Sequence, residues 1–172
     1  MGLSLRMQLN GARGALLLAF GMAFGGPAHA LSRMGEVEIS NHEGKPCFGL
    51  PASERRRLDA SVEVYGIEVY ESDSRPLRDL WAFEHAYPAS TPLPTGACIA
   101  YGQTPAAATV RQSPTPLQPG RLYSVSLHAS RKGPTHGYTT RFCLKAEADG
   151  TLKALQVRYH RTQGWTAAAC LP

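Results

Sequence analysis

The first thirty residues most constrain what this chain can become, because they have the form of an export signal and all four cysteines follow them. Arg6 and Arg13 give a positive start, residues 15–24 form an apolar run, and the small residues Ala28 and Ala30 suit a signal peptidase. The apolar run is shorter than the roughly 20 residues that cross a bilayer. We therefore expect a cleaved signal, with a retained membrane anchor as the alternative.

Cleavage after Ala30 would leave one domain, residues 31–172, which is long enough for a single core. The residue directly after the cleavage site is Leu31, not a lipid-bearing cysteine, and the signal holds no twin-arginine pair, so we expect a soluble periplasmic protein exported by the general route. The mature chain keeps 16 basic and 13 acidic residues, a formal charge of +3. That charge is too small to indicate nucleic-acid binding, and at most favours an acidic partner.

The cysteines Cys47, Cys98, Cys143 and Cys170 lie too far apart for a redox or zinc motif. In an oxidising compartment they indicate two structural disulfides, with one bridge and two buried thiols as the alternative. Of the three possible connectivities we favour Cys47 with Cys143 and Cys98 with Cys170. The reason is that Cys47 and Cys143 each stand beside a phenylalanine in an apolar segment.

Short alternating segments separated by turns predict about eight strands and no helix. The expected strands are 36–40, 46–50, 61–70, 80–84, 97–101, 122–129, 138–144 and 152–159, with a last one over 165–170. Residues 88–95 and 104–116 are rich in Pro, Ser, Thr or Ala and are expected to be loops. The pattern predicts an all-β fold, an antiparallel two-sheet sandwich.

Two local signals refine this fold. In residues 61–70 the buried parity changes across Tyr65-Gly66, which indicates a β-bulge or else a strand covered on both faces. Pro119-Gly120 precedes Tyr123, whose hydroxyl could fold back as in the tyrosine corner of Greek-key sandwiches. This stretch resembles a corner of fibronectin type III domains and favours an immunoglobulin-like or fibronectin-III-like sandwich. The alternative is an ordinary turn followed by a core tyrosine.

The sequence offers no catalytic constellation. It has no G-x-S-x-G and no H-E-x-x-H, and the cysteines are expected to be bridged. Glu36, Glu38, Glu63 and Glu68 alternate on strands as a solvated face does. We therefore expect no enzymatic activity, no cofactor and no metal.

Surface residues that could contact a protein partner are the more informative set. Arginine and tyrosine are frequent in binding hot spots, and the loops around 85–95, 103–116 and 131–137 are candidate contact regions. The candidate contacts are Arg55, Arg56, Arg57, Tyr87, Arg131, Lys132 and His136. Trp81 and Trp165 could also be anchors, although we expect both in the core.

The order of several segments resembles a known family. Cys47-Phe48, Trp81, Cys98 to Gly102, the Leu117 to Val125 corner and Phe142 to Leu144 follow one another. This order is similar to that of a family of small exported bacterial proteins, many of them lipoproteins, which includes periplasmic immunity proteins of type VI secretion systems. This chain departs from the lipoprotein members because it lacks the lipid-bearing cysteine.

The resemblance implies a protein that binds and neutralises a secreted toxic effector, with no catalytic residue to carry over. A general binding or chaperone-like accessory of the cell envelope is the alternative, because sandwich domains can bind a partner by adding a strand. An envelope enzyme or metal carrier is a third class, which metal analysis would test.

Overall fold

The computed structural model describes residues 33–55, 61–94, 96–130 and 135–171, so the expected signal lies outside this part of the chain. The predicted all-β class is confirmed, with eleven strands where about eight were expected. The strands are β1 (Arg33–Glu36), β2 (Glu38–His42), β3 (Lys45–Gly49), β4 (Ser61–Glu71), β5 (Arg78–Glu84), β6 (Thr91–Pro94), β7 (Cys98–Ala100), β8 (Thr109–Gln112), β9 (Leu122–Ser130), β10 (Thr135–Ala146) and β11 (Leu152–Val157).

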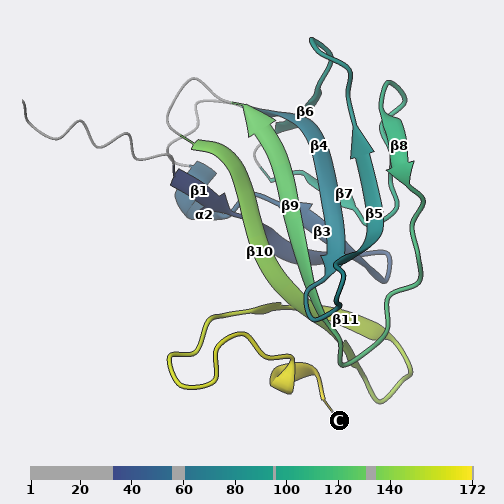
Figure 1. The fold of residues 1–172 in the computed structure, drawn as a ribbon, viewed down its shortest axis with the longest axis vertical. Coiled ribbons are helices and arrows are strands. Elements are labelled where there is room, and N and C mark those ends of the chain that lie inside the picture. The colour runs from purple at the N-terminus through teal and green to yellow at the C-terminus, as the bar shows by residue number, and fades with distance from the viewer. Residues whose placement is uncertain (1–32, 56–60, 95, 131–134, 172) are drawn as a thin grey trace, which may run out of the picture. The chain divides into compact units, whose positions relative to one another are not determined.

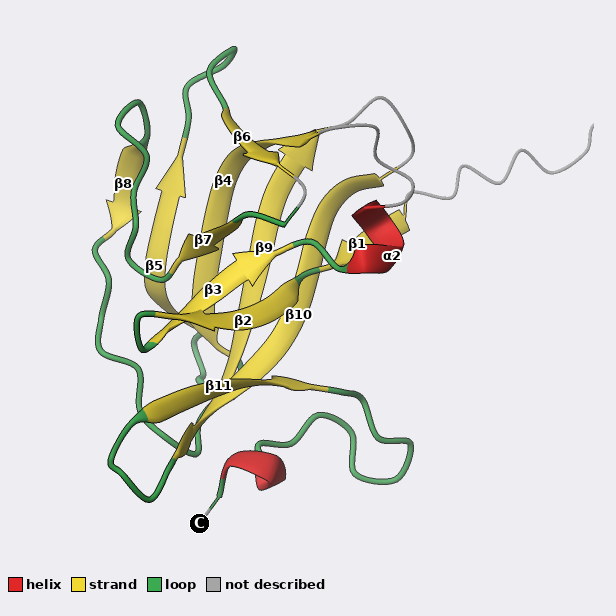
Figure 2. Cartoon of the chain, turned by 180° about the vertical axis from the view of Figure 1, so that it is seen from behind, coloured by secondary structure: helices red, strands yellow, loops and turns green. Residues whose placement is uncertain are grey.

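The strands form two sheets packed face to face. Eight belong to one sheet, in the order β1-β10-β9-β4-β5-β8, with β11 also on β10 and β6 also on β4. The other sheet has the order β2-β3-β7. Figure 1 looks onto the eight-stranded sheet, and Figure 2 shows the three-stranded sheet lying over its other side. The fold is therefore a sandwich with one broad and one small layer.

The predicted first strand is divided between the two layers. β1 runs parallel to β10 in the large sheet, whereas β2 pairs antiparallel with β3 in the small sheet. Val37, which lies between them, is fully buried. A single alternating run in the sequence thus crosses from one sheet to the other, and this crossing explains part of the underestimate in strand number.

The bulge in β4 is confirmed. The register with β9 shifts between Val64 and Gly66, and this shift turns both Val64 and Ile67 inward. A Cβ atom on Gly66 would lie 2.9 Å from the carbonyl oxygen of Phe83, so the bulge needs glycine at this position.

Trp81 lies at the centre of the core. It is fully buried, and its ring lies 5.7 Å from Phe83, 5.3 Å from Tyr101 and 6.3 Å from Phe48 of the facing sheet. The Tyr101 hydroxyl donates to the carbonyl oxygens of Leu80 (3.1 Å) and Thr115 (2.7 Å). Burial raises the pKa of Tyr101 to about 12.

The tyrosine corner is also present. The backbone N–H of Gln118 donates to the Tyr123 hydroxyl at 2.7 Å, and this hydroxyl donates to the Gln118 carbonyl oxygen at 3.0 Å. Gly120 supplies the turn with a φ of 73°. Tyr123 is buried, which raises the pKa of its phenol. The corner fixes the chain where it enters β9.

β11 joins the two layers at one end. It pairs with β10 of the large sheet and also contacts β2 and β3 of the small sheet. Asn41 on β2 fixes this contact, because its side chain donates to the carbonyl oxygen of Ala154 (3.2 Å) and accepts from the Ala154 N–H (2.8 Å). Figure 2 shows β11 crossing below β2.

Two segments expected as loops contain edge strands. β6 pairs with the start of β4, and its Pro92 and Pro94 are tolerated because an edge strand need not donate on both sides. β8 pairs with β5 only, and its residues are mostly exposed. Exposed edge strands lack the apolar alternation on which the sequence-based prediction relied.

Helical structure is limited to α2 (Ala52–Arg55) and the 3₁₀ turn η1 (Ala168–Cys170). η1 replaces the strand expected over 165–170, so that prediction was wrong. In the described part of the chain, no helix has the length and apolarity to cross a membrane.

Both disulfides form, but the favoured connectivity was wrong: Cys47 pairs with Cys98 and Cys143 with Cys170. Phe48 and Phe142 do meet across the core, with ring centroids 5.5 Å apart. Neighbouring residues of a strand point to opposite faces, so Cys47 and Cys143 point away from each other on the outer sides of different sheets. The phenylalanines that suggested the pairing are thus the reason why it cannot occur.

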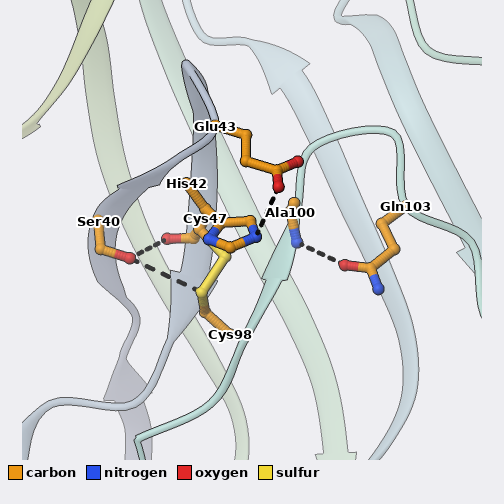
Figure 3. Close-up of a disulfide and its surroundings, with 7 residues drawn as sticks. All are labelled: Ser40, His42, Glu43, Cys47, Cys98, Ala100 and Gln103. Carbon is orange, nitrogen blue, oxygen red and sulfur yellow. Dashed lines mark hydrogen bonds and ion pairs between the residues drawn. A yellow bond between two sulfur atoms is a disulfide. The ribbon is translucent and has the colours of Figure 1, made fainter.

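Figure 3 shows Cys47–Cys98, which links the neighbouring strands β3 and β7 with Cα atoms 5.5 Å apart. The Ser40 hydroxyl donates to the Cys47 carbonyl oxygen at 3.3 Å and lies 3.8 Å from the Cys98 sulfur. This bridge therefore links two strands of the small sheet covalently.

Candidate functional site

The outer face of the eight-stranded sheet is the broadest regular surface among the described residues. Its register places Arg141, Ser124 and Tyr70 in one row across β10, β9 and β4, and Thr139, Ser126 and Glu68 in the next. Ala82 of β5 extends the second row. The small side chains of serine, threonine and alanine occupy the middle of this outer face, and aromatic and charged side chains lie around them.

An aromatic and arginine cluster stands at one border of this face. The Arg141 guanidinium carbon lies 4.8 Å from the centre of the Trp165 ring, and the rings of Trp165 and Tyr159 meet edge to face at 5.6 Å. Trp165 is 39% exposed and Tyr159 is 60% exposed, so the prediction that Trp165 is a core residue was wrong. Exposed Trp, Tyr and Arg side chains in contact are typical of binding hot spots.

The segment that carries Trp165 has little regular structure of its own. The Cys143–Cys170 disulfide ties it to β10, two positions from Arg141 on the same face. Leu122 and Val157 pack with these cysteines in a small second apolar cluster. A narrow turn, closed by paired backbone hydrogen bonds between His160 and Gly164, presents Trp165. The disulfide therefore helps to build this part of the surface.

A hollow of about 440 Å³ lies beside this cluster, and we call it the Arg141 hollow. It lies at the junction of β1, β10, β9 and β4. Its lining includes Met34, Glu36, Tyr70, Ser124, Thr139, Thr140, Arg141 and Trp165.

A second hollow of about 410 Å³, the Glu84 hollow, lies on the same face over β4, β5, β8 and β9. It contains one exposed ion pair, Glu84 with Arg111 at 2.6 Å, and the His128 imidazole lies 3.5 Å from the Glu68 carboxylate. His85 also lines it, but its ring nitrogens are held by the Thr91 hydroxyl (2.8 Å) and the Ala107 carbonyl oxygen (3.2 Å). The charges in this hollow are thus largely engaged within the protein.

No part of the described chain gathers three His, Cys, Asp or Glu side chains in a metal-binding arrangement. The outer face offers hydroxyls, aromatic rings and paired charges, a mixture that is common in protein–protein interfaces.

The structure places few of the predicted contact residues. Tyr87 is 89% exposed in the loop after β5. Arg56, Arg57, Arg131 and Lys132 lie outside the described residues, and only the backbone is described for Arg55 (in α2) and His136 (in β10). None of these residues can therefore be assigned to the outer face.

Arg141 and Tyr159 were not among the residues predicted from the sequence as contacts. Arg141 is one of several polar residues that alternate along β10, and Tyr159 continues the alternation of β11 as if it were a core residue. Only the folding of the C-terminal segment back onto β10 brings these two residues together at Trp165.

The chain matches no protein-family model, no curated protein and no solved structure.

Proposed function

We propose that this chain is an exported immunity-type protein of the periplasm that neutralises a secreted effector, delivered by a type VI system, through direct binding without catalysis. The observation that carries the proposal is the cluster of half-buried Arg141 with the partly exposed Trp165 and Tyr159, which lies beside a hollow on the large sheet. The two disulfides suit an oxidising compartment, and an inhibitor that only covers its target needs no reactive group. The resemblance of the segment order to the immunity family supports the same role.

The test is protection of a cell. A strain that lacks this gene should be harmed when the product of a neighbouring effector gene is directed to its periplasm, and the wild-type gene should restore growth. The purified protein should bind that effector directly. The proposal fails if deletion leaves the cell unharmed by every neighbouring secreted effector.

One observation favours the alternative, an envelope accessory that accepts a strand from its partner. β8 is an edge strand that pairs only with β5 among the described residues, and its Val110 is 46% exposed. Substitution Val110→Pro would block strand addition there while leaving the Arg141 hollow intact. Loss of envelope-protein binding in this variant, in a protein that gives no toxin protection, would favour the accessory role.

A further inference from the structure

We infer that the Arg141 hollow binds the side-chain carboxylate of an Asp or Glu of the partner protein. The contact is a bidentate pair of hydrogen bonds from the Arg141 guanidinium. The inference rests on the proposed function only in that the occupant belongs to a bound protein.

Arg141 differs from Arg78 and Arg111 in having no carboxylate partner among the described residues. The arginines at the ends of the large sheet are satisfied: Arg78 lies 2.7 Å from Glu71, and Arg111 lies 2.6 Å from Glu84. Arg141 is less exposed than either, yet its side chain has no ion pair or hydrogen bond with any residue that the structure describes. A half-buried cation without a counter-ion is costly, and an incoming carboxylate would remove that cost.

The contact with Trp165 positions the guanidinium of Arg141 and leaves its hydrogen-bond donors available. The Arg141 guanidinium carbon lies over the Trp165 ring, and no described residue accepts a hydrogen bond from the guanidinium, so its N–H groups keep their capacity to donate. These N–H groups form a fork that matches the two oxygens of a carboxylate. Trp165, held by Tyr159 and by the nearby Cys143–Cys170 bridge, restrains the fork before binding. A restrained arginine loses less conformational entropy when it binds.

The other residues that line the hollow leave Arg141 as the group that selects the charge of a ligand. Its lining residues include Tyr70, Ser124 and Thr139, and its volume of about 440 Å³ admits one side chain and its neighbours. Its other charged group, Glu36, is exposed and already accepts a hydrogen bond from the Gln156 amide at 2.5 Å. Arg141 is thus the charged group in the hollow whose polar atoms are not yet engaged by described residues, and it selects an anion.

The test uses the purified oxidised protein, labelled with ¹⁵N, and three acetylated tripeptides as probes, two of them also amidated at the C-terminus. Ac-Gly-Glu-Gly-NH2 carries a side-chain carboxylate, Ac-Gly-Gln-Gly-NH2 is its neutral isostere, and Ac-Gly-Gly-Gly-OH carries only a terminal carboxylate. We expect the Glu peptide to shift the Arg141 Nε–H and Trp165 indole signals with a Kd in the millimolar range. The Gln peptide should leave both signals in place.

The matched variants are Arg141→Gln and Arg111→Gln, which remove the same charge from two ends of one face. Arg141→Gln should weaken the Glu peptide at least tenfold, Arg141→Lys should give an intermediate loss because it lacks the fork, and Arg111→Gln should change binding less than twofold. The Trp165 indole signal and an intact Cys143–Cys170 bond verify that each variant is folded.

Equal shifts with the Gln peptide, or equal losses in the two Gln variants, would overturn the inference. Binding of the terminal carboxylate alone would overturn the assignment to a side chain. The proposed function fails separately: if the Glu peptide binds as expected but no effector is neutralised, the carboxylate site stands and the immunity role does not. Conversely, if the Arg141→Gln variant still protects cells fully, the Arg141 hollow is not part of the surface that neutralises the effector.

Discussion

Two regions of this protein each contain one tryptophan and one disulfide, and they are built differently. In the sandwich, Trp81 is fully buried between two sheets, and Cys47–Cys98 links two neighbouring strands. In the C-terminal segment, Trp165 is 39% exposed, and Cys143–Cys170 ties a stretch with one 3₁₀ turn to β10. The first region is stable because it has a core. The second has only a small apolar cluster and depends more on its covalent link.

The two disulfides are expected to contribute similarly to stability but differently to binding. The chain-entropy estimate gives about 4 kcal/mol for closing the 51-residue span of Cys47–Cys98 and about 3.5 kcal/mol for the 27-residue span of Cys143–Cys170. These values are too similar to distinguish the two bonds. Their positions distinguish them, because only Cys143–Cys170 adjoins the proposed binding residues.

The largest expected difference is between the tryptophans. Trp81→Ala should lower the free energy of unfolding by about 4–5 kcal/mol, because it leaves a large cavity among packed rings. Trp165→Ala should cost only about 1 kcal/mol, since it removes a partly exposed ring and one cation–π contact. Urea unfolding of both variants measures the difference. Similar losses would show that the C-terminal segment is as tightly packed as the sandwich.

The disulfides give the next contrast. Cys47→Ala with Cys98→Ala should lower the free energy of unfolding by about 4 kcal/mol, and Cys143→Ala with Cys170→Ala by about 3.5 kcal/mol or less. Peptide binding should respond in the opposite order, because only the second pair positions Trp165 beside Arg141. The measurements are urea unfolding and the NMR titration, both under conditions in which each variant is folded. Retained carboxylate binding without Cys143–Cys170 would contradict a positioning role for that bond.

Tyr123→Phe should cost about 2 kcal/mol, because it removes the hydroxyl that joins two backbone groups of Gln118 at the entrance to β9. Tyr159→Phe is the matched control. Tyr159 is 60% exposed, so the loss of its hydroxyl should change the unfolding free energy by less than about 0.5 kcal/mol. Thermal or urea unfolding of the two variants compares the two regions with one chemical change.

The smallest effect depends on pH. Burial raises the pKa of Tyr101 from 10.0 to about 12, so between these values the unfolded chain releases a proton that the folded chain retains. The contribution is fully present below pH 10 and is lost as the pH rises through 12, by up to about 2.7 kcal/mol in full and by about 1.4 kcal/mol at pH 11. Tyr101→Phe should lack this part of the alkaline loss. Urea midpoints at pH 8 and pH 11 for both proteins test it, and parallel declines would refute the assignment to Tyr101.

The residues that could be assigned from the sequence share a local cause. Tyr123 follows a Pro-Gly turn by a fixed spacing, and the parity change across Tyr65-Gly66 marks the bulge within one strand. Alternation along 122–129 and 138–144 identified Val125, Leu127, Tyr138 and Phe142 as inward residues, and all are buried. In each case the strand period of two residues decides the face.

The incorrect expectations share a different cause. β6 and β8 are edge strands, for which pairing with one neighbour replaces apolar alternation. Trp165 is half-exposed because the segment after β11 folds back onto the outer face of β10, and no residue near Trp165 signals that return. The predicted disulfide pairing was wrong for a related reason. Phe48 and Phe142 meet in the core. The cysteine next to each of them in its strand therefore points to the opposite face, away from the other cysteine.

The sequence by itself determined the all-β class, the inward face of most strands, the bulge and the tyrosine corner. These features depend on residues within a few positions of one another. Only the tertiary structure decided which cysteines pair, where the first alternating run changes sheet at Val37, and how Arg141 meets Trp165. These features depend on contacts between segments far apart in the chain, which alternation within each segment does not specify.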